Sequence, residues 1–352
     1  AESLVITRAK VTTSYRLNGG ARIGAFSPDG RSLLISSDQT GVFNGYALPI
    51  TGGEPVSLTN STTNATFAIS YFPTDGRVLV TSDGGGDELN HIYVRELDGT
   101  LRDLTPGENL KAGFLDWSAD GKTFYLTSNA RDPASFDVIA YDAETYETRL
   151  VFQNDGFFAD AISGDGRFLA LSKNVSSVRT DLYLIDLNAG SAPSLITPEA
   201  NISHNVYDFT PDGGALIYGT DQFGEFTQAR RLDLETGDTA PLIEAGWDVS
   251  DVAFSPSGRY RLSSLNADGS TELTITDTRT GRPVAITGIP GGDVGSVRFS
   301  PTEDRIAFTV LSDTSPSDIF TASLSDGVAT RLTTALNPQI DEDVLVEATV
   351  VR

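Results

Sequence analysis

The residue types that most often carry catalysis are scarce in this chain. It has 352 residues but only two histidines, His91 and His204. It contains no G-x-S-x-G nucleophile elbow, no G-x-x-x-x-G-K phosphate loop and no H-E-x-x-H zinc helix. His91 opens a predicted strand and His204 lies in a predicted link between units, so we expect each to pack or cap rather than act as a base. The sequence therefore predicts no catalytic residue.

Charged side chains gather instead in a series of polar loops. Five of them are candidates for contact with a ligand or a docked domain: Asp87, Glu88, Arg131, Asp132 and Glu225. Arg131 could pair bidentately with a substrate carboxylate. Carboxylates could also hold Ca²⁺ through their oxygens, but no D-x-D-x-D spacing supports this. We predict no metal and no cofactor. The alternative interpretation of the five residues is a solvated, charged rim.

A repeat sets the spacing of these loops. The stretch FSPDGR, Phe26 to Arg31, returns in altered form about every 45 residues. Its turn glycines are Gly30, Gly76, Gly121, Gly166, Gly213 and Gly258. In a seventh copy, Asp304 stands where the glycine is expected. A fixed period of this size is typical of an array of small structural units.

Each unit carries the pattern of four short strands. In the second unit the predicted strands are Phe67 to Phe72, Val78 to Ser82, His91 to Glu96 and Leu101 to Leu104. Gly76 is expected to supply the positive φ of the turn between the first two. Period-two alternation with Gly, Asp, Asn or Pro at regular intervals indicates an all-β chain, and no stretch shows a helical period longer than two turns.

Seven such units predict an all-β fold, a seven-bladed β-propeller with four antiparallel strands per blade. The predicted blades span about 25–66, 67–112, 113–156, 157–203, 204–247, 248–292 and 293–336. Residues 1–24 are predicted to form an N-terminal segment with a β-like run at Leu4 to Ala9, and 337–352 a linker. A β-sandwich array or a solenoid is the alternative architecture.

Strand alternation determines which connections share a face of the propeller. The loops that join second to third strands lie with the links between blades, and we name this side the link face. The turns that join first to second and third to fourth strands lie on the opposite side, the turn face. All five charged candidates fall on the link face, as do the entry and exit of the chain. Loops on a rigid scaffold are where binding residues tend to collect.

Composition excludes several classes of partner and site. The net charge is −23, so the basic footprint of a nucleic-acid-binding protein is absent. There is no cysteine, which excludes disulfides and thiolate metal sites. No run of 18 apolar residues could span a membrane. The chain also lacks methionine and starts at Ala1, which fits a removed signal peptide. We expect a periplasmic or secreted protein.

The sequence segments between the turns resemble the N-terminal propeller of the prolyl oligopeptidase family of serine peptidases. The resemblance is strongest to its exported bacterial dipeptidyl- and acylaminoacyl-peptidase-like members. The stretches that carry the resemblance are Ser82 to Gly99, Ser128 to Tyr146, Phe152 to Lys173, Thr180 to Leu187, Thr220 to Phe226 and Arg331 to Arg352. In that family a segment similar to the last one leads into an α/β-hydrolase domain, which carries the Ser, Asp and His of the catalytic triad. This chain does not contain that domain.

The resemblance implies a non-catalytic propeller that gates the access of short peptides and docks the hydrolase domain of the same polypeptide. The acidic pair that binds substrate amino termini in dipeptidyl-peptidase relatives has no secure match, and Asp87-Glu88 is the nearest pair. Two alternatives remain open. One is a stand-alone propeller that binds a protein or peptide, and the other is a Ca²⁺-dependent propeller hydrolase of lactonase type.

Overall fold

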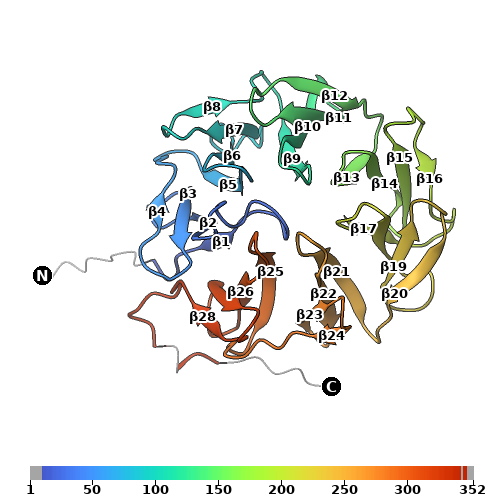
Figure 1. Cartoon of the computed structure of the whole chain (residues 1–352). Coiled ribbons are helices and arrows are strands. Elements are labelled where there is room, and N and C mark those ends of the chain that lie inside the picture. Colours follow the sequence, from blue (N-terminus) through green and yellow to red (C-terminus); the bar gives the residue numbers. More distant parts are fainter. Residues whose placement is uncertain (1–9, 342–343, 347–352) are drawn as a thin grey trace, which may run out of the picture.

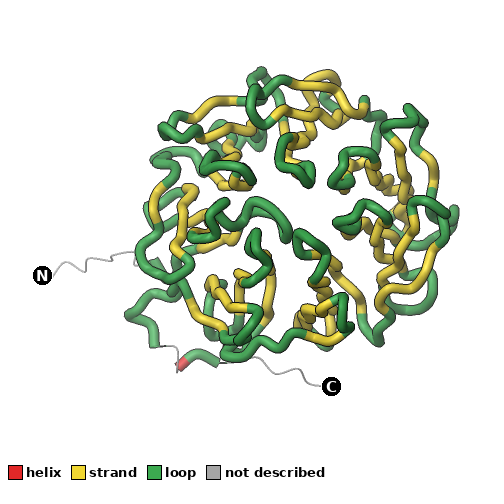
Figure 2. Tube along the Cα trace, viewed as in Figure 1, coloured by secondary structure: helices red, strands yellow, loops and turns green. Residues whose placement is uncertain are grey.

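The computed structural model describes residues 10–341 and 344–346, which form a ring of seven four-stranded sheets (Figure 1). Neighbouring strands in each sheet are antiparallel, and the first strand of each blade lies nearest the axis. Strands and loops make up almost all of the described chain (Figure 2). No helix in it is long and apolar enough to cross a bilayer. The predicted seven-bladed propeller is confirmed.

The strands follow one another from the axis outward in every blade. Blade 1 contains β1 (Tyr15–Leu17), β2 (Ser32–Ser37), β3 (Asn44–Pro49) and β4 (Val56–Ser57). Blade 2 contains β5 (Thr66–Tyr71), β6 (Val78–Ser82), β7 (His91–Arg95) and β8 (Leu101–Asp103). Blade 3 contains β9 (Ala112–Trp117), β10 (Thr123–Asp132), β11 (Ser135–Asp142) and β12 (Thr148–Phe152). Blade 4 contains β13 (Phe158–Ile162), β14 (Phe168–Ser176), β15 (Arg179–Asp186) and β16 (Ser194–Leu195).

The remaining three blades have the same order. Blade 5 contains β17 (His204–Phe209), β18 (Ala215–Thr220), β19 (Gln228–Asp233) and β20 (Thr239–Ile243). Blade 6 contains β21 (Asp248–Phe254), β22 (Tyr260–Ala267), β23 (Ser270–Asp277) and β24 (Arg282–Pro283). Blade 7 contains β25 (Asp293–Phe299), β26 (Arg305–Leu311), β27 (Asp318–Ser323) and β28 (Ala329–Arg331).

Two features of these strands differ from the sequence prediction. The first strand of blade 1 is β1, which lies inside the segment 1–24 that was predicted to precede the blades. In blades 3, 4 and 6 the second and third strands extend into long hairpins, so that only two residues separate β10 from β11. The paired strands continue where a polar loop was expected, with a register shift in blades 3 and 4 and without one in blade 6. The Leu4 to Ala9 run lies outside the described residues.

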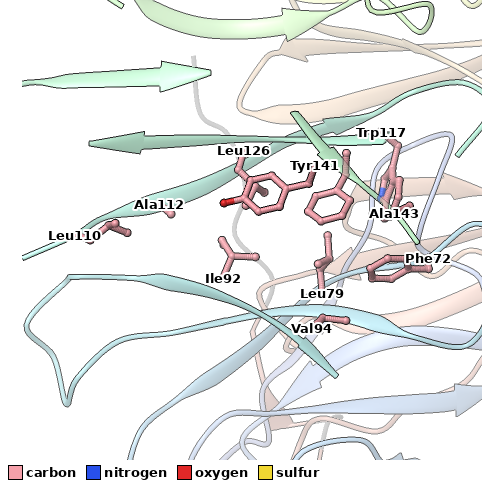
Figure 3. Close-up of a cluster of buried hydrophobic side chains, with 11 residues drawn as sticks. Phe72, Leu79, Ile92, Val94, Leu110, Ala112, Trp117, Leu126, Tyr141 and Ala143 are labelled. Atoms are coloured by element: carbon pink, nitrogen blue, oxygen red, sulfur yellow. The ribbon is translucent and has the colours of Figure 1, made fainter. Parts of the chain in front are cut away.

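Apolar side chains fill the spaces between neighbouring blades. The cluster in Figure 3 joins blade 2, through Phe72, Leu79 and Ile92, to blade 3, through Trp117 and Leu126. Phe72 meets the Trp117 ring edge-on at 5.0 Å between centroids, a favoured aromatic geometry. Both faces of each sheet are apolar, and each face is buried by the neighbouring blade on its own side. The ring is therefore held together by contacts between blades.

The repeated turn owes its sequence to a local network of hydrogen bonds. In blade 1, the Ser27 hydroxyl donates to Asp29 at 2.6 Å and accepts from the Ser32 N–H at 3.0 Å. Asp29 also accepts from the Arg31 N–H at 3.1 Å, and Gly30 has φ 69°. Glycine adopts this left-handed conformation without steric cost. The Ser-x-Asp-Gly pattern is thus explained by the turn itself and needs no ligand.

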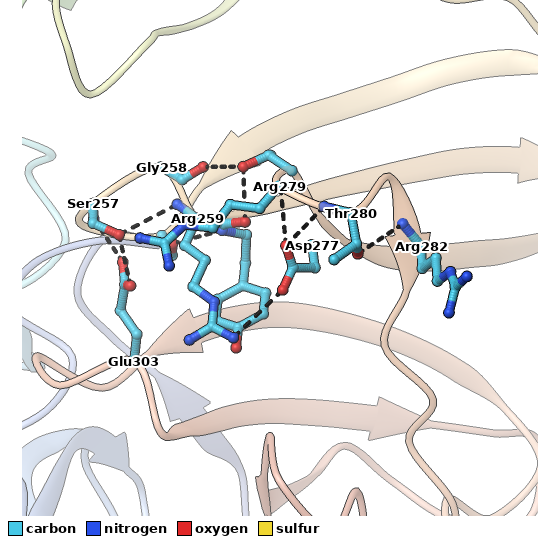
Figure 4. A network of polar contacts seen from close by, with 11 residues as sticks. Ser257, Gly258, Arg259, Asp277, Arg279, Thr280, Arg282 and Glu303 are labelled. Carbon is cyan, nitrogen blue, oxygen red and sulfur yellow. Dashed lines mark hydrogen bonds and ion pairs between the residues drawn. The ribbon is translucent and has the colours of Figure 1, made fainter.

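Two turns depart from the glycine pattern expected from sequence. In the seventh turn the left-handed residue is Glu303, with φ 55°, rather than Asp304. The Glu303 carboxylate accepts from the Ser257 N–H at 2.6 Å and from its hydroxyl at 2.7 Å, which joins the turns of blades 6 and 7 (Figure 4). In the second turn, Gly76 does not have the predicted positive φ. Counting glycines therefore misplaces these two turns by one residue.

The two ends of the described chain meet and close the ring. The Thr13 N–H donates to the Ala335 carbonyl at 2.7 Å, and the Asn337 N–H donates to the Val11 carbonyl at 2.9 Å. Thr12 and Leu336 form an antiparallel bridge between these bonds. This seam lies on the link face, beside the start of β1 and beyond the end of β28. Backbone pairing of the two ends thus supplements the packing between blades 7 and 1.

The packing between blades gives a test of the fold. Phe72 has 0% exposure, so Phe72→Ala is expected to lower the free energy of unfolding by about 3–5 kcal/mol through lost burial and a cavity. Phe158→Ala is the matched control, because Phe158 is 60% exposed and its loss should change stability by no more than about 0.5 kcal/mol. Urea denaturation followed by tryptophan fluorescence measures both. Equal effects of the two substitutions would contradict the packing described here.

Candidate functional site: the central tunnel and the link face

A short insertion in the innermost strand of blade 1 occupies the axis of the propeller. The Asn18 N–H donates to the Leu34 carbonyl at 3.0 Å, and the Leu34 N–H donates to the Ala25 carbonyl at 2.7 Å. One residue of β2 therefore pairs with two residues of the inner chain that are seven positions apart. Residues 19–24 leave the sheet between these bonds and reach toward the centre of the ring (Figure 1). We name residues 19–24 the plug.

The plug is held by backbone hydrogen bonds to blades on both sides of blade 1. The Gly19 N–H donates to the Ile69 carbonyl at 2.8 Å, and the Phe299 N–H donates to the Ala21 carbonyl at 2.9 Å. Gly24 has φ 85°, and a Cβ there would come within 1.8 Å of the Ser70 hydroxyl. A side chain at this position would displace the plug from blade 2. The local sequence, with glycine at both ends, is thus required by the close approach.

Arg22 extends from the plug across the tunnel to the opposite blades. Its guanidinium donates to Asp208 at 3.1 Å, to the Phe209 carbonyl at 3.1 Å and to Asp116 at 3.4 Å. Asp116 belongs to β9 and Asp208 to β17. One side chain therefore connects blade 1 to blades 3 and 5, which are not its neighbours in the ring.

The two carboxylates that Arg22 joins lie in a poorly solvated position. Burial raises the pKa of Asp208 to about 7 despite the opposing charge of Arg22, and the charge of Asp116 adds to the rise. Burial likewise raises the pKa of Asp116. One cation is shared between two carboxylates, so it cannot fully compensate both. The network holds the plug in place and leaves two carboxyl groups with raised pKa values in the tunnel wall.

The tunnel mouth on the turn face is narrow and apolar. One residue from each first turn surrounds it: Pro28, Pro73, Ala119, Gly164, Pro211, Pro256 and Pro301. The space that they enclose measures about 200 Å³, and Arg22, Ile23 and Gly24 of the plug line its inner side. This arrangement confirms that the seven turns lie on one face. The plug obstructs passage along the axis immediately behind this mouth.

Further along the tunnel-facing strands, more ionisable side chains appear. Asp160 on β13 and Asp251 on β21 are exposed to solvent within the ring. The surrounding protein nevertheless raises the pKa of Asp160 to about 6 and raises the pKa of Asp251. Arg298 on β25 faces the same region. The strands bulge here, with a register shift at Asp160 between Ala159 and Ala161, and bulges re-aim side chains.

Of the residues predicted from sequence, Asp87 and Glu88 lie in the blade 2 loop of the link face. Asp87 accepts from the Gly84 and Leu89 N–H groups at 3.0 Å each, and these bonds lower the pKa of its carboxyl. It lines a polar cavity of about 630 Å³ that also includes Asp83 and His91. Glu88 is exposed and has φ 61°. The two acidic side chains thus belong to a well-defined loop beside a cavity.

The other three predicted residues lie apart from this cavity. Arg131 is in β10, not in a loop, and its guanidinium donates to both oxygens of the buried Asp137 at 2.8 Å each. Its bidentate geometry is therefore already used within the fold. Asp132 accepts from the Ala134 N–H at 3.0 Å in the hairpin turn. Glu225 is exposed in the blade 5 loop. Within the described chain, no hydrogen bond or ion pair joins any of these five residues to another.

Neither histidine has the geometry of a catalytic base. His204 is 3% exposed, its Nδ1 bonds the Thr180 carbonyl at 2.9 Å, and burial lowers its pKa. His91 Nδ1 bonds Asp103 at 2.8 Å, as in a hydrolase triad, and Ser82 lies opposite His91 in the sheet. The Ser82 hydroxyl, however, donates to the Ala65 carbonyl at 2.8 Å. In the described part of the chain no group of three or more His, Cys, Asp or Glu side chains could hold a metal.

Sequence reasoning missed the plug and its partners, although a signal was present. Asp116 and Asp208 stand two residues before the turn Ser or Thr, in inner strands that are otherwise largely apolar. Blades 1, 4 and 6 have alanine at this position: Ala25, Ala161 and Ala253. An acidic residue in place of alanine on a buried strand needs a cation. Arg22, which lies in a stretch without a strand pattern, was a candidate for this cation.

Comparison with known proteins identifies the family. The model of the N-terminal β-propeller domain of prolyl oligopeptidase matches residues 60–334. The chain belongs to this propeller family. No curated protein sequence matches it. Membership explains the four-stranded repeat and agrees with the resemblance carried by the sequence motifs.

Solved structures share the fold of this propeller. A structure from a study of two prolyl endopeptidases superposes with a TM-score of 0.71 at 15% identity, covering 95% of this chain and 51% of its own. An oligogalacturonate lyase in complex with manganese gives 0.63 at 16%, covering 93% and 91%. TolB from Acinetobacter baumannii gives 0.51 at 15%, covering 88% and 79%. The chain thus spans about half the length of the prolyl endopeptidase.

The Arg22 network predicts a stability defect. Arg22→Met would leave Asp116 and Asp208 near each other without a cation, and is expected to cost about 2 kcal/mol or more of unfolding free energy. The double substitution Arg22→Met with Asp208→Asn should recover part of this loss. Arg31→Met is the control, because Arg31 is exposed on a turn. Denaturation midpoints measure all three, and an unchanged Arg22→Met midpoint would refute the role of the network.

The raised pKa of Asp208 predicts a pH-dependent difference. Its pKa is about 7 in the folded chain and near 3.8 in the unfolded chain, so the folded state binds the proton more tightly. The stability that this proton provides is present at low pH and is lost as the pH rises through about 7. As the pH rises from about 5 to about 8, the unfolding free energy of Asp208→Asn should therefore increase relative to that of the wild type.

The control for this pH dependence is Asp98→Asn. Backbone hydrogen bonding to Thr100 lowers the pKa of Asp98, so its carboxyl stays ionised across this range. The stability difference between Asp98→Asn and the wild type should stay constant with pH. Denaturation at several pH values provides both differences, and parallel curves for Asp208→Asn and the wild type would contradict the assignment.

Proposed function

We propose that this chain is the propeller that covers the active site of a serine peptidase of prolyl oligopeptidase type. Its link face would dock an α/β-hydrolase domain that carries the catalytic triad. The family match over residues 60–334 supports the kind of enzyme. The plug is the observation that supports the role of a cover, because a ring whose axis is obstructed can shield a chamber on its link face from solvent and from bulky chains.

The plug also restricts the route that a substrate could take. Arg22 and the plug backbone occupy the axis behind the turn-face mouth. A peptide would then reach the chamber between the two domains, or through a separation of blades, rather than along the tunnel. Such a cover excludes water and large substrates, which is a gating contribution and not a chemical one. Short peptides are the substrates that this arrangement favours.

The link face has the features that docking would use. Three long hairpins, β10–β11, β14–β15 and β22–β23, project from it. Val175 and Val178 at the tip of the β14–β15 hairpin are 50% and 57% exposed, and Phe223 in the blade 5 loop is 55% exposed. Exposed apolar side chains beside charged ones are typical of interfaces between domains.

A stand-alone binding module is the second candidate function. It is favoured by the similarity to TolB, whose chain is covered over 79% of its length. The oligogalacturonate lyase, covered over 91% of its length, is an enzyme and supports only the size of such a chain. A propeller of this size can thus make up most of a protein. The gene downstream of the codon for residue 352 distinguishes the two proposals. An open reading frame that continues into an α/β-hydrolase supports the first, and a stop codon there supports the second.

The proposed division of labour predicts that the isolated chain is inactive. It should neither hydrolyse peptidyl nitroanilides nor react with a fluorophosphonate, because the Ser82 hydroxyl donates to the Ala65 carbonyl rather than to His91, and His204 is buried. The same chain linked to its hydrolase domain should do both. Labelling detected by mass spectrometry gives the answer, and a covalent adduct on the isolated chain would refute the proposal. Ser82→Ala is the variant that would show whether such an adduct involved the blade 2 cavity.

A further inference from the structure

A groove between blades 6 and 7 contains an arginine whose charge is compensated only in part. The groove measures about 570 Å³ and runs beside the inner strands β21 and β25. Its lining includes Arg298, Asp251, Ser264 and Ser296, together with Ala21 of the plug. The groove is therefore bordered by the plug, by the inner strands and, at Ser317, by the link-face loop of blade 7.

Arg298 has no carboxylate at hydrogen-bonding distance in the described chain, unlike several other arginines of the inner and link-face regions. Arg22, Arg131 and Arg179 each donate to at least one carboxylate at 3.4 Å or less. Arg298 instead donates a hydrogen bond from Nη1 to the carbonyl of its own neighbour Val297 at 3.1 Å. Its Nε is buried and has no hydrogen-bond partner in the described part of the chain.

The surroundings of Arg298 disfavour its charged form. Burial lowers the pKa of Arg298 to about 10, and the charge of Asp251 opposes this only in part. No ion pair joins the two among the described residues. Asp293, at the edge of the groove, accepts from the Thr271 N–H at 2.7 Å. Buried charges in proteins are normally paired, so a guanidinium without an ion-pair partner leaves a position for an anion.

The backbone at the groove is also irregular. The register of β25 against β26 shifts between Gly295 and Arg298, and Ser296 within this bulge has φ 49°. A non-glycine residue in the left-handed region is strained, and bulges commonly redirect a side chain at a binding site. Register shifts also occur in the inner strands of blades 2 to 6, but among the described residues only the blade 7 bulge holds a non-glycine residue with positive φ.

We propose that the groove between blades 6 and 7 binds a carboxylate group of a peptide, with Arg298 as its cationic partner. A guanidinium presents a planar fork that matches a carboxylate, and such charge-assisted pairs are strong when partly buried. The carboxylate can come from a peptide C-terminus or from an acidic side chain. The inference deepens the proposed function by assigning a substrate feature to the chamber side of the propeller. Only the identification of the ligand as a substrate rests on that function.

Calorimetric titration of the chain with three short peptides tests the site. The probes are acetyl-Ala-Ala with a free C-terminal carboxylate, the same peptide as its amide, and amidated acetyl-Ala-Glu. At least one carboxylate-bearing probe should bind about tenfold or more tightly than the neutral amide. Preference for the first probe identifies a C-terminus as the ligand, and preference for the third identifies an acidic side chain. Equal affinity for all three, or no binding, would overturn the proposal.

Variants connect the binding to the arginine. Arg298→Gln should abolish the preference for the carboxylate, whereas Arg279→Gln, the same change at an exposed turn of blade 6, should keep it. Because Arg298 forms no ion pair among the described residues, Arg298→Gln is not expected to lower the melting temperature. Retained preference in Arg298→Gln would refute the site.

A second variant keeps the proposal testable if Arg298→Gln does not fold. Asp251→Asn removes the nearest opposing charge, so it should tighten carboxylate binding by several-fold. Weaker binding in Asp251→Asn would contradict the proposal. These measurements need no hydrolase domain. If the gene ends after residue 352 but the carboxylate preference persists, the groove remains a binding site and only the peptidase assignment fails.

Discussion

Each sheet of this propeller has two apolar faces, and no blade can bury both by itself. The clusters that unite Phe72 with Trp117 in blades 2 and 3, or Tyr260 with Phe299 in blades 6 and 7, show how neighbours solve this problem in turn. The solution works only if the series closes on itself, since an open end would expose a whole sheet to water. Ring closure is therefore the constraint on which the turns, the plug and the placement of the loops depend.

Closure also creates the chemistry at the centre. Seven inner strands converge on the axis, where their side chains have little room and limited water. Three blades place alanine two residues before the turn Ser or Thr, but Asp116, Asp208 and Arg298 occupy the same position in blades 3, 5 and 7. Arg22 pairs with both carboxylates and compensates them in part, whereas Arg298 has no such ion pair in the described chain. The tunnel is thus asymmetric in charge although the scaffold is nearly symmetric in shape.

The repeat allowed much of the fold to be predicted, because each turn specifies itself locally. The Ser27 hydroxyl, the Asp29 carboxylate and Gly30 satisfy one another within five residues, so their spacing is visible in the chain. Strands such as β6, Val78–Ser82, were predicted to the residue for the same reason. Glu303 misled the count because a hydrogen bond to another blade, and not its own φ preference, holds it in place.

The candidate site could be predicted far less well, because its partners come from distant parts of the chain. Arg22 and Asp208 are 186 residues apart in sequence, and only ring closure brings them within hydrogen-bonding distance. Arg131 was predicted to pair bidentately with a substrate carboxylate, but Asp137, six residues later, already pairs bidentately with its Nε and Nη2. Asp87 was placed correctly in a link-face loop, yet its hydrogen-bond partners are backbone N–H groups rather than another candidate. Long-range pairing decides which charges remain available.

The seam between residues 10–13 and 335–337 has a mechanical consequence. Every other junction between blades is crossed by the continuous polypeptide, whereas this one is crossed only by noncovalent contacts, among them the backbone bonds of Thr13 and Asn337. A force that pulls the two ends apart loads these few bonds in parallel with the packing of blades 7 and 1, and nothing covalent shares the tension. The seam is therefore the junction of the described ring that lacks covalent support, and its contacts limit how far blades 7 and 1 can separate.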